Sequence, residues 1–189
     1  MTDPRKLWTD REAGARFADP GDCATRATRF ERTIRRRNAF EYAAGVVVVL
    51  GFGWAAVEAF RLGETLIGVA LGSLALVVPA VLWVLHRRGA NLPRRPESSC
   101  REHLRAQLVR QYRLLRSAPL WYVGPLVPGS LLLYYAIGSR VAEKAGWSAA
   151  LSGMAAPAAV TFGLYALIAA GNWFGAKGLK RQIDQLDAG

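Results

Sequence analysis

Four long stretches without a single charged side chain constrain this chain more than any other feature. These uncharged stretches are residues 42–57, 65–85, 118–139 and 145–176. Roughly twenty helical residues cross the ~30 Å hydrocarbon core of a bilayer, whereas the apolar residues of a soluble domain recur at the helical or strand period. The sequence therefore predicts four transmembrane helices, at about 42–60, 65–85, 118–139 and 152–174.

Short links group these helices in pairs. Only four residues separate the first helix from the second, and so short a link requires adjacent antiparallel helices. We therefore expect two transmembrane hairpins, over residues 42–86 and 118–175. Three prolines near the start of the second hairpin, Pro119, Pro125 and Pro128, predict a kinked or irregular backbone there.

A basic amphipathic helix is expected before the first hairpin, over residues 22–41. Its apolar residues recur at three- and four-residue intervals and form one narrow stripe, which consists of Cys23, Ala27, Phe30 and Ile34. Arginines occupy the other faces. Residues 1–21 form a polar tail, in which we expect Trp8 to contact either the headgroup region or a protein partner.

A second basic helix is expected between the hairpins. The connecting loop, residues 87–117, holds nine Arg and two acidic residues. Within it, residues 98–116 fit an amphipathic helix with an apolar stripe of Leu104, Leu108, Tyr112 and Leu115. A basic tail, residues 176–189, ends the chain. The expected fold class is all-α, a polytopic membrane protein with four transmembrane helices in two hairpins and basic amphipathic cytoplasmic helices.

Positive charge marks one side of the membrane as cytoplasmic. Cytoplasmic flanks of membrane proteins carry an excess of Lys and Arg. Here 22 of the 25 Lys and Arg residues fall in the N-terminal segment, the central loop and the C-terminal tail, and three fall in the other two links. The count predicts a multi-pass protein of the bacterial inner (cytoplasmic) membrane with both termini in the cytoplasm.

The net charge of +11 follows from this orientation bias and suits a bilayer surface with anionic phospholipid headgroups. Nucleic acid is the less expected partner. Base stacking needs several aromatic side chains, and Tyr112 is the only Phe, Trp or Tyr on the helix expected at 98–116.

Two sets of residues are candidates for interactions. Small residues let helix backbones approach closely in lipid, where no hydrophobic drive acts between helices. The candidate helix-packing residues are Gly68, Gly72, Ala155, Ala159, Gly163, Gly171 and Gly175. The amphipathic helices can lie on anionic lipid, pack together, or bind a protein partner through their apolar stripes. This candidate lipid or partner surface comprises Trp8, Phe30, Ile34, Arg35, Arg36, Arg37, Arg105, Leu108, Tyr112, Leu115 and Arg116.

The sequence predicts no metal site, no cofactor and no catalysis. Cys23, Cys100, His86 and His103 lack zinc-type spacing, and a reducing cytoplasm disfavours a disulfide between the two cysteines. His103 follows Cys100 by three residues but has no evident acid or oxyanion site nearby. No zinc-protease, P-loop or G-x-S-x-G motif occurs. We therefore expect a protein that is not an enzyme.

Short motifs spread over most of the chain carry a family resemblance. They are Leu7-Trp8, Phe30, Ile34-Arg35-Arg36-Arg37-Asn38, Glu41-Tyr42, Leu85-His86-Arg87-Arg88-Gly89, Leu114-Leu115-Arg116-Ser117, Trp121-Tyr122 and the segment from Gly124 to Gly129. In their order the chain resembles a family of small, largely uncharacterised bacterial membrane proteins with four helices, some of which are encoded beside alternative sigma factors. The resemblance implies a regulatory role by association and assigns no activity to named residues.

Two functions fit this pattern. Amphipathic order in segments that anchoring does not require favours a membrane-anchored interaction or regulatory protein, which presents basic amphipathic helices to a cytoplasmic protein partner. The alternative is an oligomeric small transporter or channel subunit, suggested by the prolines within spans and by Glu58 and Asn172 near span ends. Four helices form a pore only with further copies, so the alternative requires a homo-oligomer.

Overall fold

The computed structural model of the protein describes residues 20–93 and 98–188, with side chains described from Cys23 onward. Within these ranges every regular element is helical, and no strand occurs. The all-α prediction is therefore confirmed. Trp8 and the rest of residues 1–19 lie outside the described residues.

Helix α2, Pro20–Arg61, carries the basic segment and the first apolar block in one element of 42 residues. It ends at a glycine turn. Gly63 has a φ of 76°, a left-handed conformation that suits a residue without Cβ. The Gly63 N–H donates to the Phe60 carbonyl at 3.1 Å, and the Glu64 N–H donates to the Ala59 carbonyl at 2.8 Å. This Schellman pattern satisfies carbonyls at the helix end and turns the chain sharply.

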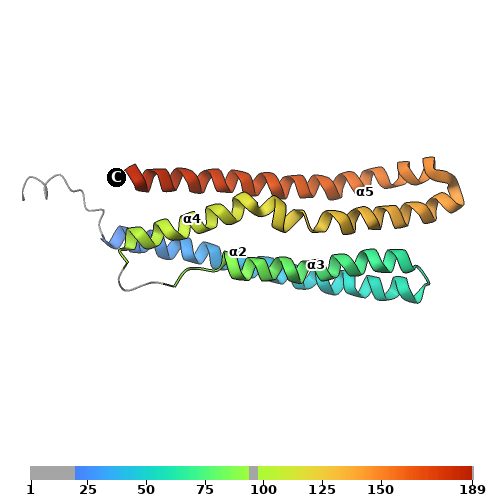
Figure 1. Cartoon of the computed structure of the whole chain (residues 1–189), viewed down its shortest axis with the longest axis horizontal. Helices are drawn as coiled ribbons and strands as arrows, with labels where there is room; N and C mark the ends of the chain where they lie inside the picture. The colour runs from blue at the N-terminus through green and yellow to red at the C-terminus, as the bar shows by residue number, and fades with distance from the viewer. Residues whose placement is uncertain (1–19, 94–97, 189) are drawn as a thin grey trace, which may run out of the picture.

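Helix α3, Thr65–Gly89, runs back along α2 and completes the first hairpin (Figure 1). Glycines bring the two helices close together. A Cβ added at Gly45 of α2 would lie 2.7 Å from the Leu82 side chain, and one added at Gly68 would lie 2.8 Å from the Phe60 ring. Close backbone approach at small residues is how helices associate in lipid.

Helix α4, Cys100–Ala118, begins with a capping box. The Glu102 N–H donates to Ser99 Oγ at 3.2 Å, and the Ser99 N–H donates to Glu102 Oε2 at 3.0 Å, which satisfies two N–H groups at the helix start. The helix passes into a π-helical turn, η1, Pro119–Val123. The irregular backbone expected at the start of the second hairpin is therefore confirmed, since proline cannot supply a regular helical N–H.

Helix α5, Leu126–Ala188, spans 63 residues, within which Gly146 has non-helical angles of φ 80° and ψ 161°. Figure 1 shows the ribbon doubling back at its far end, in the orange part of α5. Gly146 therefore divides α5 into two antiparallel arms, over residues 126–145 and 147–188. Helical structure runs through most of the segment 140–151, which separates the third and fourth predicted spans.

In the described residues, three helical stretches are long and apolar enough to cross a membrane, where the sequence predicts four transmembrane helices. They are Cys23–Arg61, Thr65–Gly89 and Cys100–Ala188. The count differs because the third and fourth predicted spans belong to one helical stretch. The charges at 140–144 do not interrupt the helix, since Arg140 donates to Glu143 one turn later at 2.9 Å, an i,i+3 pair that supports it.

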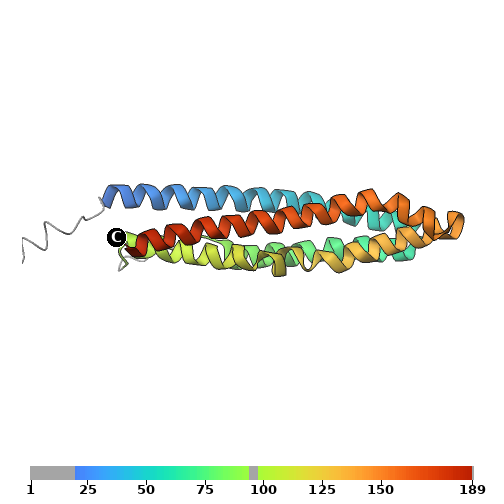
Figure 2. The ribbon, with the colours of Figure 1, turned by 90° about the horizontal axis from the view of Figure 1, so that it is seen from above.

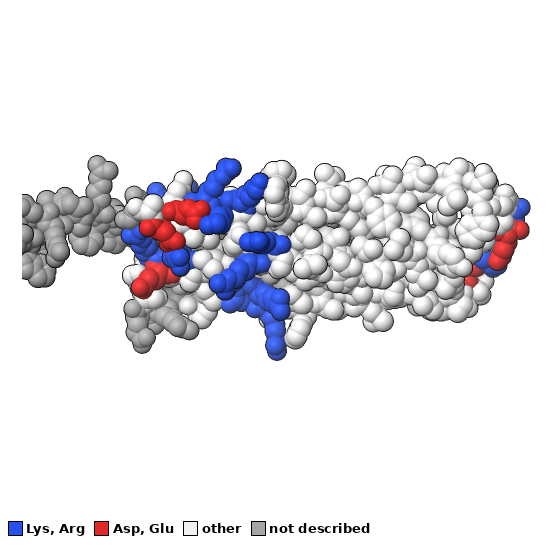
Figure 3. All heavy atoms as spheres, turned by 45° about the horizontal axis from the view of Figure 1, so that its top comes forward, with Lys and Arg blue, Asp and Glu red and all other residues white. Residues whose placement is uncertain are grey.

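The helices lie side by side along the long axis of the molecule, in two layers. One layer is the α2–α3 hairpin, and the other contains α4, η1 and α5 (Figure 1). The start of α2 and the end of α5 lie at the same end. Figure 3 shows that charged side chains gather at this end and at the opposite tip, with a broad uncharged band between them.

The uncharged band exposes large apolar side chains. Trp54, Leu76 and Leu167 have exposed fractions of 71%, 78% and 69%. Soluble monomers rarely expose contiguous apolar patches of this kind, whereas lipid solvates such side chains. The composition and the surface of the band are compatible with a membrane protein.

Candidate functional site

Three basic helical segments pack together at the charged end. They are residues 23–38 of α2, helix α4, and residues 176–187 of α5. Figure 2 shows the last arm of α5 lying over the space between α2 and α4. The buried cluster at their centre consists of Ala27, Leu104, Leu108, Leu179 and Ile183. We call this assembly the basic bundle.

The predicted apolar stripes form the interior of the basic bundle. Ile34 and Leu108 have exposed fractions of only 3% and 2%. Phe30, Tyr112 and Leu115 are half-buried and pack against the central cluster. These five candidate surface residues thus face neighbouring helices of the same chain, and the surface offered outward is formed mainly by arginines.

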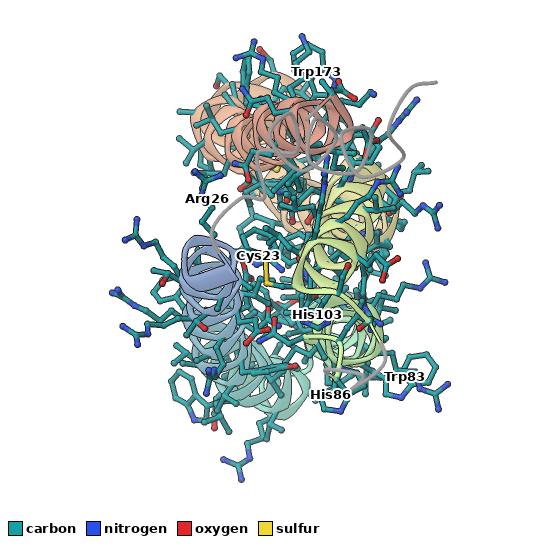
Figure 4. All side chains as sticks on the ribbon, turned by 90° about the vertical axis from the view of Figure 1, so that its left-hand side faces the viewer. Cys23, Arg26, Trp83, His86, His103 and Trp173 are labelled. Carbon is teal, nitrogen blue, oxygen red and sulfur yellow. A yellow bond between two sulfur atoms is a disulfide. The ribbon has the colours of Figure 1, made fainter. Side chains whose placement is uncertain are left out.

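The two cysteines meet in the basic bundle, which corrects the prediction that they do not pair. A disulfide joins Cys23, near the start of α2, to Cys100, at the start of α4, and the two Cα atoms lie 6.2 Å apart. Figure 4 shows the bond beside the labelled Cys23. The prediction relied on the expected compartment alone, whereas the pairing follows from the side-by-side packing of two helices that are 77 residues apart in sequence.

A polar seam joins α2 to α4. His103, Gln107 and Gln111 follow one another at four-residue intervals on α4, and all three are buried. His103 Nε2 lies 3.1 Å from Glu31 Oε1, and Arg37 Nη2 donates to Gln111 Oε1 at 3.0 Å. Arg37 is therefore turned toward the seam, unlike its neighbours in the arginine run.

Gln107 lies at the centre of this seam without a protein partner. Its side chain is 1% exposed, and neither of its amide atoms has a hydrogen bond within the described part of the chain. An unsatisfied buried polar group costs about 1–3 kcal/mol. The seam is thus less stabilising per residue than the apolar cluster beside it.

Side chains from the basic bundle hold the end of α3. Asn38 Nδ2 donates to the Gly89 carbonyl at 2.9 Å. Arg110 donates from Nε to the Arg88 carbonyl at 2.9 Å and from Nη2 to the Arg87 carbonyl at 2.6 Å. The last carbonyls of a helix have no partner within the helix, so these bonds cap α3 and fix the first hairpin to the basic bundle.

Exposed arginines lie on the outer surface of the basic bundle, and Figure 3 shows Lys and Arg side chains gathered on one face of it. We call these exposed residues the arginine collar: Arg26, Arg29, Arg32, Arg35, Arg36, Arg87, Arg88, Arg101, Arg105, Arg113 and Arg116. Few acidic groups neutralise the positive charge of these arginines. Arg105 binds Asp187 through two hydrogen bonds of 2.6 and 2.8 Å, and Arg116 donates to the Tyr112 hydroxyl at 2.8 Å.

A groove of about 780 Å³ runs along the outer face of α4 beside the end of α3. Among the residues that the structure describes, its lining includes five arginines and a single acidic residue: Arg87, Arg88, Arg105, Arg110, Arg113 and Glu102. Val109 and Leu114 contribute apolar surface. We call it the α3–α4 groove. Sequence patterns do not indicate this groove, because its shape depends on how the end of α3 packs beside α4.

The predicted helix-packing residues divide into two groups. Gly68 contacts α2, and Gly175 lies near Leu115, whose Cδ1 would be 3.3 Å from an added Cβ. Nothing lies within 4 Å of a Cβ added at Gly72, Gly163 or Gly171, and Ala155 and Ala159 are exposed. Gly129, absent from the predicted set, makes the close contact between the hairpins, since an added Cβ would lie 2.8 Å from Leu74.

The two hairpins are also joined at the tip opposite the basic bundle. Arg140 donates from Nε to Glu64 Oε2 at 2.6 Å and from Nη2 to Glu64 Oε1 at 2.5 Å. This two-bond geometry suits an arginine–carboxylate pair, and it holds the pKa of Glu64 below its ordinary value of 4.5. Sequence analysis missed the pair because the residues are 76 positions apart.

The described residues contain no group of three or more His, Cys, Asp or Glu side chains that could hold a metal ion. His86 lies with its Nδ1 3.3 Å from the Tyr42 hydroxyl, and Figure 4 shows it at the end of α3, away from His103. Of the four residues considered for zinc, Cys23 and Cys100 are joined in the disulfide and His86 lies beside Tyr42.

Comparisons with known proteins found no family model, no curated protein and no solved structure that matches this chain.

Proposed function

We propose that this chain is a multi-pass protein of a bacterial inner membrane, which anchors the basic bundle at the cytoplasmic face and uses the arginine collar to bind an acidic protein partner. In this proposal the hairpins serve as the anchor, and the two arms of α5 provide the third and fourth spans. It is an interaction or regulatory protein and not an enzyme.

One observation carries the proposal: the apolar stripes of the basic helices are buried within the chain, so a partner contacts the arginines on the outer faces. An amphipathic helix that binds lipid by its apolar face must leave that face open. Ile34 and Leu108 are instead enclosed by α2, α4 and α5. A folded, cationic surface beside the membrane favours an anionic partner through complementary potential.

The orientation rests on charge. The ends of the chain and the central loop hold 22 of the 25 Lys and Arg residues. The described parts of these segments, the start of α2, α4 and the end of α5, lie at the charged end of the molecule (Figure 1, Figure 3). The positive-inside bias then assigns this end to the cytoplasm. In a reducing cytoplasm the Cys23–Cys100 disulfide would be reduced, and the packing of the bundle would keep the two thiols close together.

Charge reversal tests the proposed partner surface. The full chain would be crosslinked in its native membranes, purified by an affinity tag, and compared with a collar variant carrying Arg29→Glu and Arg32→Glu. The matched control reverses two charges at the opposite tip, Arg61→Glu and Lys144→Glu. We expect a protein that is recovered with the wild type and the control and lost with the collar variant. Identical recovery from all three would contradict the proposal.

The transporter or channel alternative has weaker support. Glu58 pairs with Arg61 one turn later at 2.8 Å, and both side chains are more than a third exposed. The Asn172 side chain donates to the Ile168 carbonyl of its own helix at 2.8 Å. Both residues that suggested a transport site are thus engaged locally. Flux through reconstituted liposomes that disappears with Glu58→Ala would revive this alternative.

A further inference from the structure

The arginines of the α3–α4 groove are not equally engaged. Arg105 is held by Asp187, and Arg110 is held by the carbonyls at the end of α3. The guanidinium groups of Arg88 and Arg113 have no hydrogen bond or ion pair among the described residues, although both residues line the groove. Two guanidinium groups with unused donors on facing walls suit a phosphate, which they can bind through paired N–H donors.

The acidic residue in the lining does not balance these charges. Glu102 accepts a hydrogen bond from the Ser99 N–H at 3.0 Å and belongs to the cap of α4. It lies fifteen positions from Ser117, which lines the other end of the groove. At 1.5 Å per helical residue this separation is roughly 22 Å. The membrane-side half of the groove is therefore strongly cationic.

Apolar side chains continue both walls of the groove toward the uncharged band. On the α3 wall, the Arg87 guanidinium lies 4.6 Å from the centre of the Trp83 ring, and Figure 4 shows Trp83 directed away from the bundle. On the α4 wall, Leu120 follows Ser117 by three residues and is 81% exposed. A cationic site thus opens directly onto a surface that suits hydrocarbon.

We infer that the α3–α4 groove binds an anionic phospholipid of the cytoplasmic leaflet. The phosphodiester lies between Arg88 and Arg113, and the acyl chains descend along Trp83 and Leu120. A soluble anion would use the cationic half of the site alone, whereas a phospholipid uses both halves, as basic pockets beside transmembrane helices do. The inference rests on the membrane insertion proposed above.

The test measures the thermal stability of the full chain in an uncharged detergent while phosphatidylglycerol is added, with phosphatidylcholine as the comparison. A ligand that binds only the folded state raises the midpoint of unfolding in a concentration-dependent way. We expect stabilisation by phosphatidylglycerol to exceed that by phosphatidylcholine. An arm with inorganic phosphate separates lipid from free anion, and we expect no stabilisation there at equal concentration.

Two double variants with the same charge change locate the site. Arg88→Gln with Arg113→Gln should weaken phosphatidylglycerol binding by roughly 100-fold, since each charge-assisted hydrogen bond to the phosphate contributes roughly tenfold or more. Arg35→Gln with Arg36→Gln removes two exposed arginines of α2 that do not line the groove, and it should change binding by less than about fivefold. The conservative Arg88→Lys with Arg113→Lys keeps both positive charges and should restore part of the lost lipid binding. The unfolding midpoint of the groove variant without lipid shows whether that variant still folds.

Equal losses of phosphatidylglycerol binding in the groove variant and the control would overturn the inference, because diffuse positive charge would then explain the binding. Equal stabilisation by the two lipids, or full stabilisation by inorganic phosphate, would also overturn it. A chain that stays monodisperse without detergent would instead overturn the membrane insertion on which both proposals depend. Failure of lipid selectivity in a chain that needs detergent leaves the proposed interaction function standing.

Discussion

The uncharged band and the basic bundle are built from the same helices but are stabilised in opposite ways. In the band, large apolar side chains point outward, and Leu76 is 78% exposed. In the basic bundle, Leu108 is 2% exposed and arginines point outward. Close contacts at glycines, such as Gly129 against the Leu74 side chain, hold the band together. The comparison teaches that one helix can present an apolar surface that suits lipid along one part and a charged surface that suits water along the other.

The same substitution should have very different effects in the two regions. Leu108→Ala removes a buried side chain from the centre of the basic bundle, which should lower the free energy of unfolding by about 2–5 kcal/mol. Leu76→Ala removes a side chain that faces lipid or detergent, and the change should stay within about 0.5 kcal/mol. Hydrogen exchange of α4 and α3 amides in detergent would measure both. Equal losses in the free energy of unfolding would contradict the distinction between the basic bundle and the uncharged band.

Glycine substitutions test the close helix packing within the uncharged band. Gly129→Ala would place a Cβ 2.8 Å from Leu74, which is itself buried at 2% exposure and cannot swing away. Overpacking of this kind costs about 1–3 kcal/mol. Gly163→Ala is the matched control, because nothing lies within 4 Å of the added Cβ. Thermal unfolding in detergent should separate the two variants, and equal midpoints would show that the hairpins do not meet at Gly129.

The smallest expected effect concerns the ion pair at the far tip. The hydrogen bond from Arg140 lowers the pKa of Glu64 in the folded state. A carboxyl group with a lowered folded pKa stabilises the fold above its ordinary pKa of 4.5, and this contribution disappears as the pH falls through the folded value. The effect is small because water screens the pair. Unfolding midpoints between pH 6 and pH 3 should decline slightly less for Glu64→Gln than for the wild type, and parallel curves would argue against the pair.

Much of the fold follows from one-dimensional patterns. The uncharged stretches mark the segments that suit lipid, and the stripe that includes Phe30 and Ile34 marks a helix with one buried face. Ser99 and Glu102 at the start of α4 form the cap that their spacing favours. Each of these features depends on residues within a few turns of one another, so the order of residues is enough to reveal it.

The contacts that define the candidate site depend instead on which helices become neighbours. The polar seam between Glu31 and His103, the α3–α4 groove and the Cys23–Cys100 pair all join segments from different parts of the chain. A stripe shows that a face is buried, but it does not show what buries it. The amphipathic stripes were therefore compatible with lipid, with a partner and with one another, and the packing of α2, α4 and α5 distinguishes these cases.

The central claim is that the basic helices pack upright against one another instead of lying flat on the membrane. Cys23 and Cys100 test it most directly, because helices spread on the surface would carry each cysteine roughly 27 Å from its entry into the bilayer, in separate directions. The measurement is labelling of both thiols with a maleimide polymer in native membranes, before and after mild oxidation. We predict that oxidation protects both thiols within one monomer, whereas Cys23→Ser leaves Cys100 open to label. Thiols that stay reactive after oxidation, or that link two copies of the chain, would contradict the account.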